Sequence, residues 1–463
     1  MPFLDTLIII AKEIFIMRRY LNFILLIAIA TLTFSSMPAL ADEGIVEAKL
    51  SQEYLDWLEA RKNGEVQKGG HVPFPADLSH LADNPPNESL LYPGGRNKAG
   101  TPPTKYDLRS VNGKSYVTPI KNQNPYGTCW AHAAIGAMES NYLMQGGESL
   151  DLSEMHLAYF TYINSDKTKV FDRAYSTSRV LDEGGNSFYP TVLFSRLEGP
   201  VPESEVPYPT TPSKSTPESY TRVLRLREVY YLNFDNMNVN GSDNQRNIVK
   251  RRIMDTGAVV ANYYDDDNYY STDQKSYYRK SSSTVTNHAI QIIGWDDSYS
   301  RSNFRTNPER DGAWLIKNSW GEKFADKGYM WISYANYLDE GAAFIVEASN
   351  PTMKVYYYDP LGWTGGKRGW VSSKVYIANA FKAGSSGETL TEVGFFTYDN
   401  NQDYEVTVYT GLGKTMPSSP TSGTQITAAT TSGTIPFAGY HTVTLNSPVA
   451  LTEGEYFSVV LKY

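Results

Sequence analysis

A single cysteine, Cys129, lies where a turn-rich stretch meets a helical pattern. One cysteine cannot form an internal disulfide, so its thiol must pack in the core, bind a metal or react. No second cysteine accompanies it, which argues against a metal site. Turn-forming residues precede position 129, and apolar residues then recur at helical spacing until Gly146 and Gly147. The stretch therefore predicts a thiol in the first turn of a helix.

The position at a helix N-terminus favours reactivity over packing. Unpaired N–H groups and the helix dipole stabilise an anion there, so we expect a lowered thiol pKa and an available thiolate at Cys129. Gln123, a neutral amide donor, lies six residues earlier (129 − 123) on the loop that leads into the helix. A thiolate and a nearby amide donor are two parts of an acyl-transfer site. The remaining part is a base.

Length, charge and the N-terminal leader limit the class of protein. A chain of 463 residues predicts two or three domains, and a formal net charge of −8 argues against a nucleic-acid partner. Residues 1–41 are typical of a signal peptide: Arg18 and Arg19 precede an apolar run, and an Ala-Leu-Ala cleavage site ends at Ala41. Met17 is an alternative start, and an uncleaved anchor helix is the alternative interpretation. We expect a secreted or cell-surface protein that meets the membrane only through this leader.

Residues 42–104 begin with a helical pattern and then become rich in Pro, Asn and Gly. We call them the N-terminal segment. One interpretation is a propeptide that crosses and blocks an active site until it is removed. The other is an extension that packs on the next domain or serves as a linker. The low packing potential of the segment fits both.

Residues 105–350 form the candidate catalytic domain. Residues 286–295 alternate and are β-branched, which predicts a buried strand with His288 near its start, and 312–321 predict another strand that ends at Asn318. The other five histidines lie in helices, in the N-terminal segment or in the C-terminal region, where a structural role is the default. The tyrosine-rich residues 262–280 are expected to form a solvated surface insertion. Their aspartates lack EF-hand spacing, so no metal is expected.

These motifs, taken in order, resemble the papain family of cysteine peptidases. The resemblance spans roughly residues 105–345 and is specific because the whole ordered set is present. It rests on Gln123 with Cys129 and Trp130, on residues 287–289, on residues 318–321, on residues 106–109 and 152–154, and on Gly184 with Gly185. One departure is Tyr126, which occupies the place of a disulfide cysteine in the family.

The resemblance implies a role for each matching residue. Cys129 would be the nucleophile and His288 its general base and acid. Asn318 would orient the imidazole, and Trp320 would shield that hydrogen bond from water. Gln123 and the Cys129 amide would form the oxyanion hole. The substrate-binding residues would be Gly184, Gly185, Ala289 and Trp320, with Gly185 pairing with the substrate backbone as a strand.

Residues 351–463 change character, because Thr, Ser, Gly, Val and Tyr dominate and helical periodicity ends. Strand-like runs separated by turn clusters predict a β-sandwich, which resembles the lectin-like domain that follows the peptidase in some secreted prokaryotic papain homologues. Trp363 and Trp370 could stack on sugars, but packing on the protein is favoured.

The expected fold is therefore α+β, with a papain-like helical lobe and antiparallel β lobe followed by an all-β sandwich. The leading hypothesis is a secreted cysteine endopeptidase that acts on protein or peptide substrates without a cofactor, with a carbohydrate or cell-surface ligand possible for the sandwich. The alternatives are a surface adhesin that keeps a papain-like scaffold, and a transpeptidase that uses the same triad. A decayed scaffold would be free to lose any of the four site residues, which argues against the adhesin.

Overall fold

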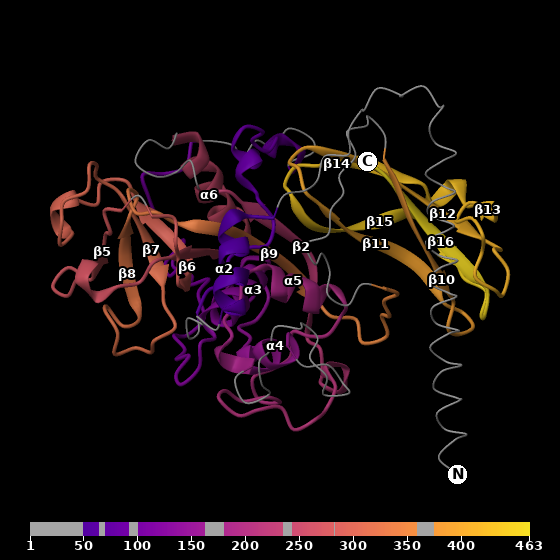
Figure 1. The fold of residues 1–463 in the computed structure, drawn as a ribbon, viewed down its shortest axis with the longest axis horizontal. Helices are drawn as coiled ribbons and strands as arrows, with labels where there is room; N and C mark the ends of the chain where they lie inside the picture. The colour runs from indigo at the N-terminus through magenta and orange to yellow at the C-terminus, as the bar shows by residue number, and fades with distance from the viewer. Residues whose placement is uncertain are drawn as a thin grey trace, which may run out of the picture. The chain divides into compact units, whose positions relative to one another are not determined.

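The computed structural model describes residues 50–63, 70–91, 101–162, 180–234, 243–281, 283–358 and 375–463 (Figure 1). The predicted leader, the start of the N-terminal segment, Trp363 and Trp370 lie outside these ranges. Among the described residues, no helix has the length and apolar character needed to cross a membrane.

The helix predicted after the turn-rich stretch is confirmed as α3 (Cys129–Met144). Almost every residue of α3 is buried, as expected for a helix that is surrounded by other elements of its domain. It packs against the strands β6 (His288–Asp296) and β9 (Asp339–Ala348). The other α-helices of the described residues are α2 (Gln52–Lys62), α4 (Glu154–Phe160), α5 (Phe188–Ser195) and α6 (Asp243–Thr256). Short 3-10 helices span Ser79–Ala82, Glu88–Leu91, Val180–Asp182, Pro217–Ser219, Asp267–Tyr269, Arg301–Asn303 and Thr427–Ala429.

The larger sheet of the described residues has eleven strands and carries both predicted site strands at its centre. Its order is β11-β15-β2-β9-β3-β6-β7-β8-β5-β4, with β1 paired to β6. Strand β6 pairs antiparallel with β7, so the strand that begins at His288 lies beside the strand that ends just before Asn318. The bounds not yet given are β1 (Lys105–Asp107), β2 (Leu224–Leu232), β3 (Val259–Tyr263), β4 (Tyr270–Ser271), β5 (Ser276–Tyr277), β7 (Ala313–Lys317), β8 (Tyr329–Ser333), β11 (Thr389–Thr397) and β15 (Gly439–Ala450).

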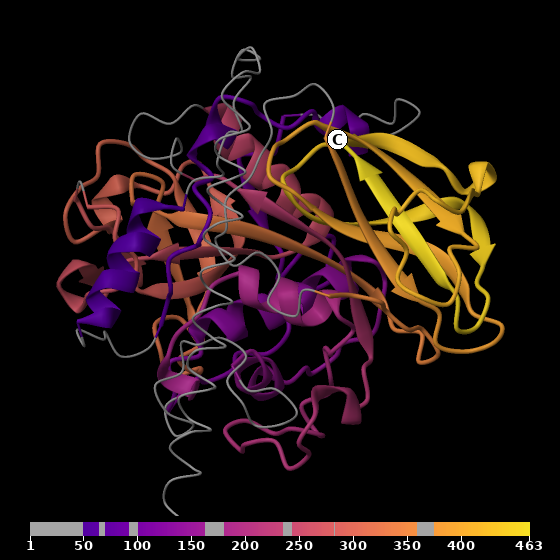
Figure 2. The same cartoon turned by 45° about the vertical axis from the view of Figure 1, so that its right-hand side comes forward.

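The C-terminal region is all β, as predicted, and two of its strands extend the larger sheet. Strand β15 pairs with β2 through Gly439, Tyr440 and His441, so the C-terminal strands and the candidate catalytic domain share one sheet (Figures 1 and 2). The second sheet contains β10 (Tyr376–Lys382), β12 (Gln402–Thr410), β13 (Thr424–Gln425), β14 (Thr431–Ile435) and β16 (Tyr456–Lys462). A separate apolar cluster that includes Val406, Phe457 and Leu461 forms the core of this region.

The prediction of a solvated insertion at 262–280 is wrong for three of its tyrosines. Tyr263, Tyr277 and Tyr278 are almost fully buried. Their phenol groups find partners: the Tyr263 hydroxyl donates to the Asp265 carboxylate at 2.9 Å, and Tyr278 donates to Glu309 at 3.0 Å. A tyrosine ring can enter a core when its hydroxyl remains paired, so the polar composition of the stretch misled the sequence prediction.

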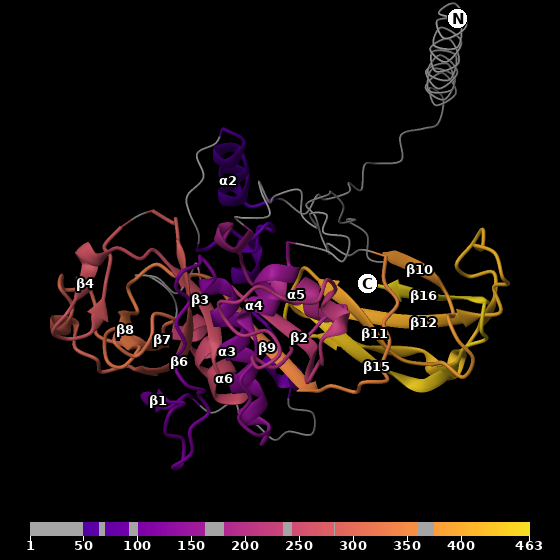
Figure 3. The same cartoon turned by 90° about the horizontal axis from the view of Figure 1, so that it is seen from below.

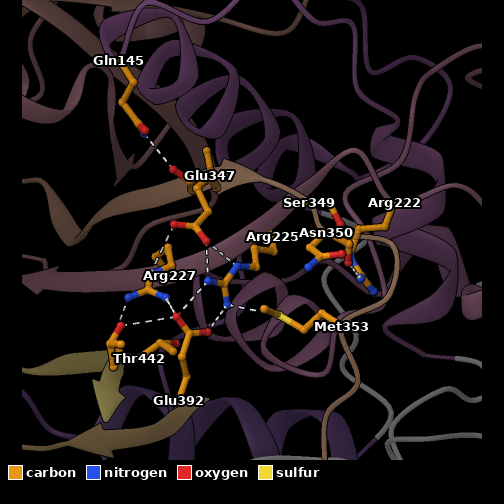
Figure 4. A network of polar contacts seen from close by, with 12 residues as sticks. Gln145, Arg222, Arg225, Arg227, Glu347, Ser349, Asn350, Met353, Glu392 and Thr442 are labelled. Carbon is orange, nitrogen blue, oxygen red and sulfur yellow. Dashed lines mark hydrogen bonds and ion pairs between the residues drawn. The ribbon is translucent and has the colours of Figure 1, made fainter. Parts of the chain in front are cut away.

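An ion-pair network joins the two regions beside the shared sheet (Figure 4). Arg225 of β2 donates to both oxygens of Glu392 on β11, at 2.6 and 3.0 Å. The same arginine pairs with Glu347 of β9, and Arg227 reaches both Glu392 and the carbonyl oxygen of Thr442. Burial opposes ionisation of Glu392, but its hydrogen bond from Arg225 holds the pKa below its usual value. The fork geometry fixes β11 against the catalytic sheet.

Replacing Glu392 by glutamine should lower the free energy of unfolding by about 1–3 kcal/mol, because two largely buried guanidinium groups lose a shared counter-charge. Urea denaturation measures the loss. The control is Glu405→Gln, which removes the partner of Lys462 in a more exposed pair and should change stability by less than about 0.5 kcal/mol. Equal effects of the two substitutions would show that the network adds nothing to the junction.

Candidate active site

The thiol of Cys129 lies at the start of α3, against the first residues of β6. Cys129 is fully buried, and its Sγ accepts a hydrogen bond from the backbone N–H of Ala289 at 3.4 Å. Ala289 directly follows His288, the first residue of β6. The packing of α3 on β6 therefore places the Cys129 sulfur against the backbone of the residue that follows His288, although the two segments lie far apart in the chain.

The ring of His288 is held in one orientation by Asn318. Its Nε2 lies 2.8 Å from Asn318 Oδ1, and the same oxygen accepts the Ser319 backbone N–H at 2.7 Å. Because this atom accepts a backbone N–H, it must be the oxygen of the Asn318 amide and not the nitrogen. The ring Nε2 that faces it therefore carries the hydrogen and donates. The other ring nitrogen, Nδ1, is left as the basic one. Trp320 stacks on the ring with centroids 4.4 Å apart and an angle of 29° between the planes.

Gln123 joins the same hydrogen-bonded group through Ser319. The Gln123 backbone N–H donates to the Ser319 carbonyl oxygen at 2.8 Å, and the Ser319 hydroxyl donates to Gln123 Oε1 at 2.7 Å. The side-chain Nε2 of Gln123 donates to the Tyr126 carbonyl oxygen at 3.2 Å. Sequence reasoning did not assign a role to Ser319. The only sequence signal for a role of Ser319 was its position between Asn318 and Trp320.

Burial reverses the expected charge state of the site. Desolvation raises the pKa of Cys129 to about 11, although backbone N–H groups near the helix start act in the opposite direction. Desolvation likewise lowers the pKa of His288 to about 4, although the bond to Asn318 favours the charged ring. The expectation of an available thiolate is therefore wrong for the state that the structure describes. The helix terminus does stabilise the anion, but exclusion of water costs more.

Residues 70–72 of the N-terminal segment run past the site and form a β-bridge with Gly185. The carbonyl oxygen of Gly70 accepts from Gly185 N–H at 3.1 Å, and Val72 N–H donates to the Gly185 carbonyl oxygen at 2.8 Å. On the other side, His71 N–H donates to the carbonyl oxygen of Asn287 at 3.2 Å. Figure 3 shows the helix α2 of the same segment outside α3 and α5.

Two glycines make this close approach feasible. Gly70 has φ +105°, and a Cβ there would lie 2.2 Å from the Asn287 carbonyl oxygen. A Cβ on Gly185 would lie 2.3 Å from the Trp130 ring. Both positions therefore require a residue without a side chain. The predicted strand-pairing glycine, Gly185, is in this structure paired with the N-terminal segment of its own chain.

One group of potential metal ligands occurs among the described residues, away from Cys129. Donor atoms of His71, Asp339 and Glu340 lie within 4.8 Å of one another. His71 Nε2 and Glu340 Oε2 are 3.0 Å apart, which is a direct hydrogen bond. The histidine of this group is therefore already hydrogen-bonded to a carboxyl group, without a metal ion.

Comparison with known proteins gives two family matches. Residues 102–343 match the papain family cysteine protease family, and residues 355–463 match the lectin like domain family. A viral cathepsin of Heliothis zea nuclear polyhedrosis virus is 27% identical over 231 residues, which are 49% of this chain and 52% of the relative. The matched region thus spans about half of that relative's length.

Two solved structures cover both regions. The cysteine protease and lectin-like domains of Cwp84, a surface layer associated protein of Clostridium difficile, align with a TM-score of 0.69 and 26% identity, over 90% of this chain and 84% of that chain. Clostridial Cwp84 after propeptide cleavage aligns with a TM-score of 0.61 and 27% identity, over 75% of this chain and 81% of that chain. The predicted α+β fold with a C-terminal all-β domain is confirmed.

Proposed function

The chain belongs to the papain family of cysteine proteases, and from this premise we propose that it is a secreted endopeptidase whose nucleophile is Cys129. The family is one of cysteine-type peptidases, which are hydrolases. The roles of the individual residues, the secretion of the protein and its ligands are part of what we propose. The observation that carries it is the contact of the Cys129 sulfur with the residue that follows His288, beside a ring whose tautomer is fixed by Asn318.

The mechanism follows from that arrangement. His288 Nδ1 takes the proton of the Cys129 thiol, and the sulfur attacks the carbonyl carbon of the scissile peptide bond. Gln123 Nε2 and the Cys129 backbone N–H donate to the oxygen as it becomes negative. His288 then returns its proton to the leaving amine, and an acyl-enzyme remains. Water, deprotonated by His288, attacks the thioester carbon; the acid product leaves and the thiol regains its proton.

A thiol-directed epoxide tests this role of Cys129. We expect the processed enzyme to be labelled stoichiometrically at Cys129, as read by peptide mass spectrometry, and to cleave a denatured protein substrate. Labelling should disappear in His288→Ala, because the thiol then lacks its base. Absence of both labelling and cleavage in the wild-type protein would instead favour the adhesin. Joined rather than hydrolysed peptides in the product spectrum would identify a transpeptidase.

We further propose that the N-terminal segment is a propeptide that keeps the enzyme latent. Residues 70–72 occupy the backbone groups of Gly185 and Asn287 that a substrate strand would use. Burial raises the pKa of the Cys129 thiol to about 11, so the neutral thiol predominates at pH 7. Latency thus has two causes, occupation of the cleft and removal of water from the reacting pair. The cleaved propeptide of Cwp84 is in line with this assignment.

Replacing Gly70 by valine should loosen the segment and activate the unprocessed chain, because the new side chain meets the Asn287 carbonyl oxygen. We expect Cys129 in the unprocessed variant to be alkylated at pH 7 at least about tenfold faster than in wild type, since a few kcal/mol of strain shifts the closed state accordingly. Stopped-time mass spectrometry on a chain whose processing is blocked measures the rate.

The matched control for this experiment is Gly113→Val. Gly113 also has a positive φ, +79°, but a Cβ there meets nothing within 4 Å. Backbone strain alone would affect both variants, whereas opening of the cleft would affect Gly70→Val only. Unchanged alkylation in Gly70→Val would mean that the segment is a packed extension without an inhibitory role.

The C-terminal domain is proposed to hold the enzyme at a carbohydrate-bearing or other cell surface. The support is the lectin like family match at residues 355–463 and the surface-layer association of Cwp84. The hydrogen-bonded sheet shared by β15 and β2 would then fix the cleft relative to that surface. Sedimentation of the full chain with isolated cell-wall material, in the presence and absence of competing polysaccharide, tests this part of the proposal.

A further inference from the structure

The turn of residues 398–401, between β11 and β12 in the C-terminal region, contacts the N-terminal segment. The Tyr398 hydroxyl donates to the Asp77 carbonyl oxygen, and the Tyr398 ring stacks on the imidazole of His80 with centroids 4.4 Å apart. His80 Nε2 lies 3.1 Å from the Tyr398 carbonyl oxygen and 3.2 Å from Asp399 Oδ1. Burial opposes protonation of the ring, but its hydrogen bond to Asp399 holds the pKa of His80 above its usual value. The segment therefore meets the turn through a stacked pair of rings and through polar contacts.

Two asparagines of the same turn bind the segment further along the chain. Asn400 Nδ2 donates to the Asn84 carbonyl oxygen at 2.8 Å, and Asn84 Nδ2 donates to the Asn400 carbonyl oxygen at 3.0 Å. Asn401 Nδ2 donates to Asn84 Oδ1 at 3.1 Å and to the Pro85 carbonyl oxygen at 2.9 Å. Asn401 Oδ1 accepts the Asn87 backbone N–H at 2.6 Å. Five hydrogen bonds therefore join these two asparagines to the segment.

The C-terminal region itself holds this turn in the binding conformation. Asn400 is 5% exposed, and its Oδ1 accepts the Ala438 backbone N–H at 2.8 Å, so only its Nδ2 faces the segment. The backbone of Asn401 is in the left-handed region, with φ +58°, where glycine has the lower cost. The asparagine side chain at that position makes its three hydrogen bonds with the segment. The turn thus presents a set of donors and acceptors that fits one stretch of this chain.

The contact lies close in the chain to the residues that cover the cleft. Asp77 follows Val72, which pairs with Gly185, by five residues (77 − 72). Five residues span at most about 18 Å when fully extended. Residues 70–72 therefore remain near the cleft even when they open, as long as the turn keeps its hold, and the high effective concentration favours reclosing. Beyond the turn the segment returns to the catalytic domain, where Arg252 donates to the Glu88 carboxylate at 3.0 Å.

We propose that the C-terminal domain has a second function, as an anchor for the N-terminal segment: the turn 398–401 binds residues 77–87 and thereby keeps residues 70–72 over the cleft. The inference rests on the proposed latency of the unprocessed chain. Its consequence is that cleavage of the chain does not by itself end latency. The cleaved segment stays bound until it leaves the turn, so dissociation from the C-terminal domain is a separate step of activation.

A synthetic peptide of residues 70–91 tests the anchor on the full-length protein, after natural processing and removal of the cleaved segment. Fluorescence anisotropy of the labelled peptide measures its Kd. Asn401→Gly keeps the left-handed backbone but deletes three hydrogen bonds, so we expect Kd to rise at least about tenfold. A peptide with Asn84→Ala should bind wild type with a similar loss. Both changes together should cost less than the product of the two losses, because Asn84 and Asn401 share a hydrogen bond.

The matched control is Asn112→Gly. Asn112 is exposed, also has a positive φ, +53°, and lies in the turn that Val111 and Lys114 close. This variant should bind the peptide as wild type does. In the unprocessed chain, Asn401→Gly should be alkylated at Cys129 at least about tenfold faster than wild type at pH 7, because the opening of the segment shifts by the same factor as Kd. The processed Asn401→Gly enzyme should keep the wild-type kcat.

The outcomes separate the anchor from the function on which it rests. A peptide that does not bind wild type, an unchanged Kd in Asn401→Gly, or an equal change in Asn112→Gly overturns the anchor. Unchanged alkylation of unprocessed Asn401→Gly also overturns it, since the segment would then cover the cleft without the turn. These results leave the peptidase assignment standing. A processed wild-type protein that is neither alkylated nor active overturns that assignment, while the Kd values still decide whether the turn binds the segment.

Discussion

His288→Ala should lower kcat for peptide hydrolysis by about 10⁴- to 10⁶-fold, which is the largest effect expected of any single substitution here. The reason is that the ring performs two proton transfers, from the Cys129 thiol and to the leaving amine. Without it the thiol must ionise unaided in a site that disfavours charge. Cys129→Ala should cost a similar factor, and the double variant should lose little more, because the two groups act as one unit.

A buried histidine elsewhere provides the control. His441 of β15 is 1% exposed and its Nε2 lies 3.2 Å from Thr397 Oγ1, so His441→Gln removes an imidazole of comparable burial from the C-terminal region. Its turnover, measured on folded protein, should stay within a few-fold of wild type. Burst kinetics with an activated ester and steady-state cleavage of a peptide both report the difference. A His288→Ala enzyme that keeps more than a tenth of wild-type turnover would contradict the proposed mechanism.

Gln123→Ala should slow turnover by roughly a hundred- to a thousand-fold, mainly in kcat, because the amide stabilises charge that develops only after the sulfur attacks. The structure supports such a role through the way the amide is held. Ser319 fixes Oε1 at 2.7 Å, and the contact of Nε2 with the Tyr126 carbonyl oxygen uses one of its two hydrogens. The second hydrogen remains for the oxyanion. Turnover within a few-fold of wild type would remove Gln123 from this role.

Two further substitutions sharpen the test of Gln123. Gln145 lies at the opposite end of α3 and donates to the Val346 carbonyl oxygen at 2.7 Å, so Gln145→Ala removes an equally well bonded amide far from the cleft (Figure 4). It should leave kcat unchanged. Ser319→Ala releases the Gln123 side chain without deleting it, and the loss of one neutral hydrogen bond should cost roughly five- to tenfold, with recovery in Ser319→Thr.

Local sequence patterns correctly predicted the elements of the site that depend on interactions between residues close in the sequence. The helix that starts at Cys129, the strand that starts at His288 and the strand before Asn318 all follow from periodicity, turn residues and β-branched composition. The start of α4 is likewise local, since the Ser153 hydroxyl caps it by accepting the His156 N–H. Each of these features depends on residues only a few positions apart.

Two predictions that depended on burial were wrong. The tyrosines of 262–280 looked solvated because their neighbours are polar, yet Tyr263 and Tyr277 lie in the core. Cys129 was expected to be ionised because a helix terminus favours an anion, yet its burial raises the pKa of the thiol. In both cases the deciding contribution comes from residues that the local pattern does not contain.

The sequence by itself determined the family, the α+β class and the order of the elements that carry Cys129, His288 and Asn318, because motif spacing and hydrophobic periodicity are properties of short segments. Only the tertiary structure decided that Ser319 links Asn318 to Gln123, that β15 extends the larger sheet through β2, and that His71 forms a buried hydrogen bond with Glu340. The contacts from Ser319 to Gln123 and from His71 to Glu340 join residues 196 and 269 positions apart. Packing and the pairing of buried polar groups determine these contacts, rather than any local preference.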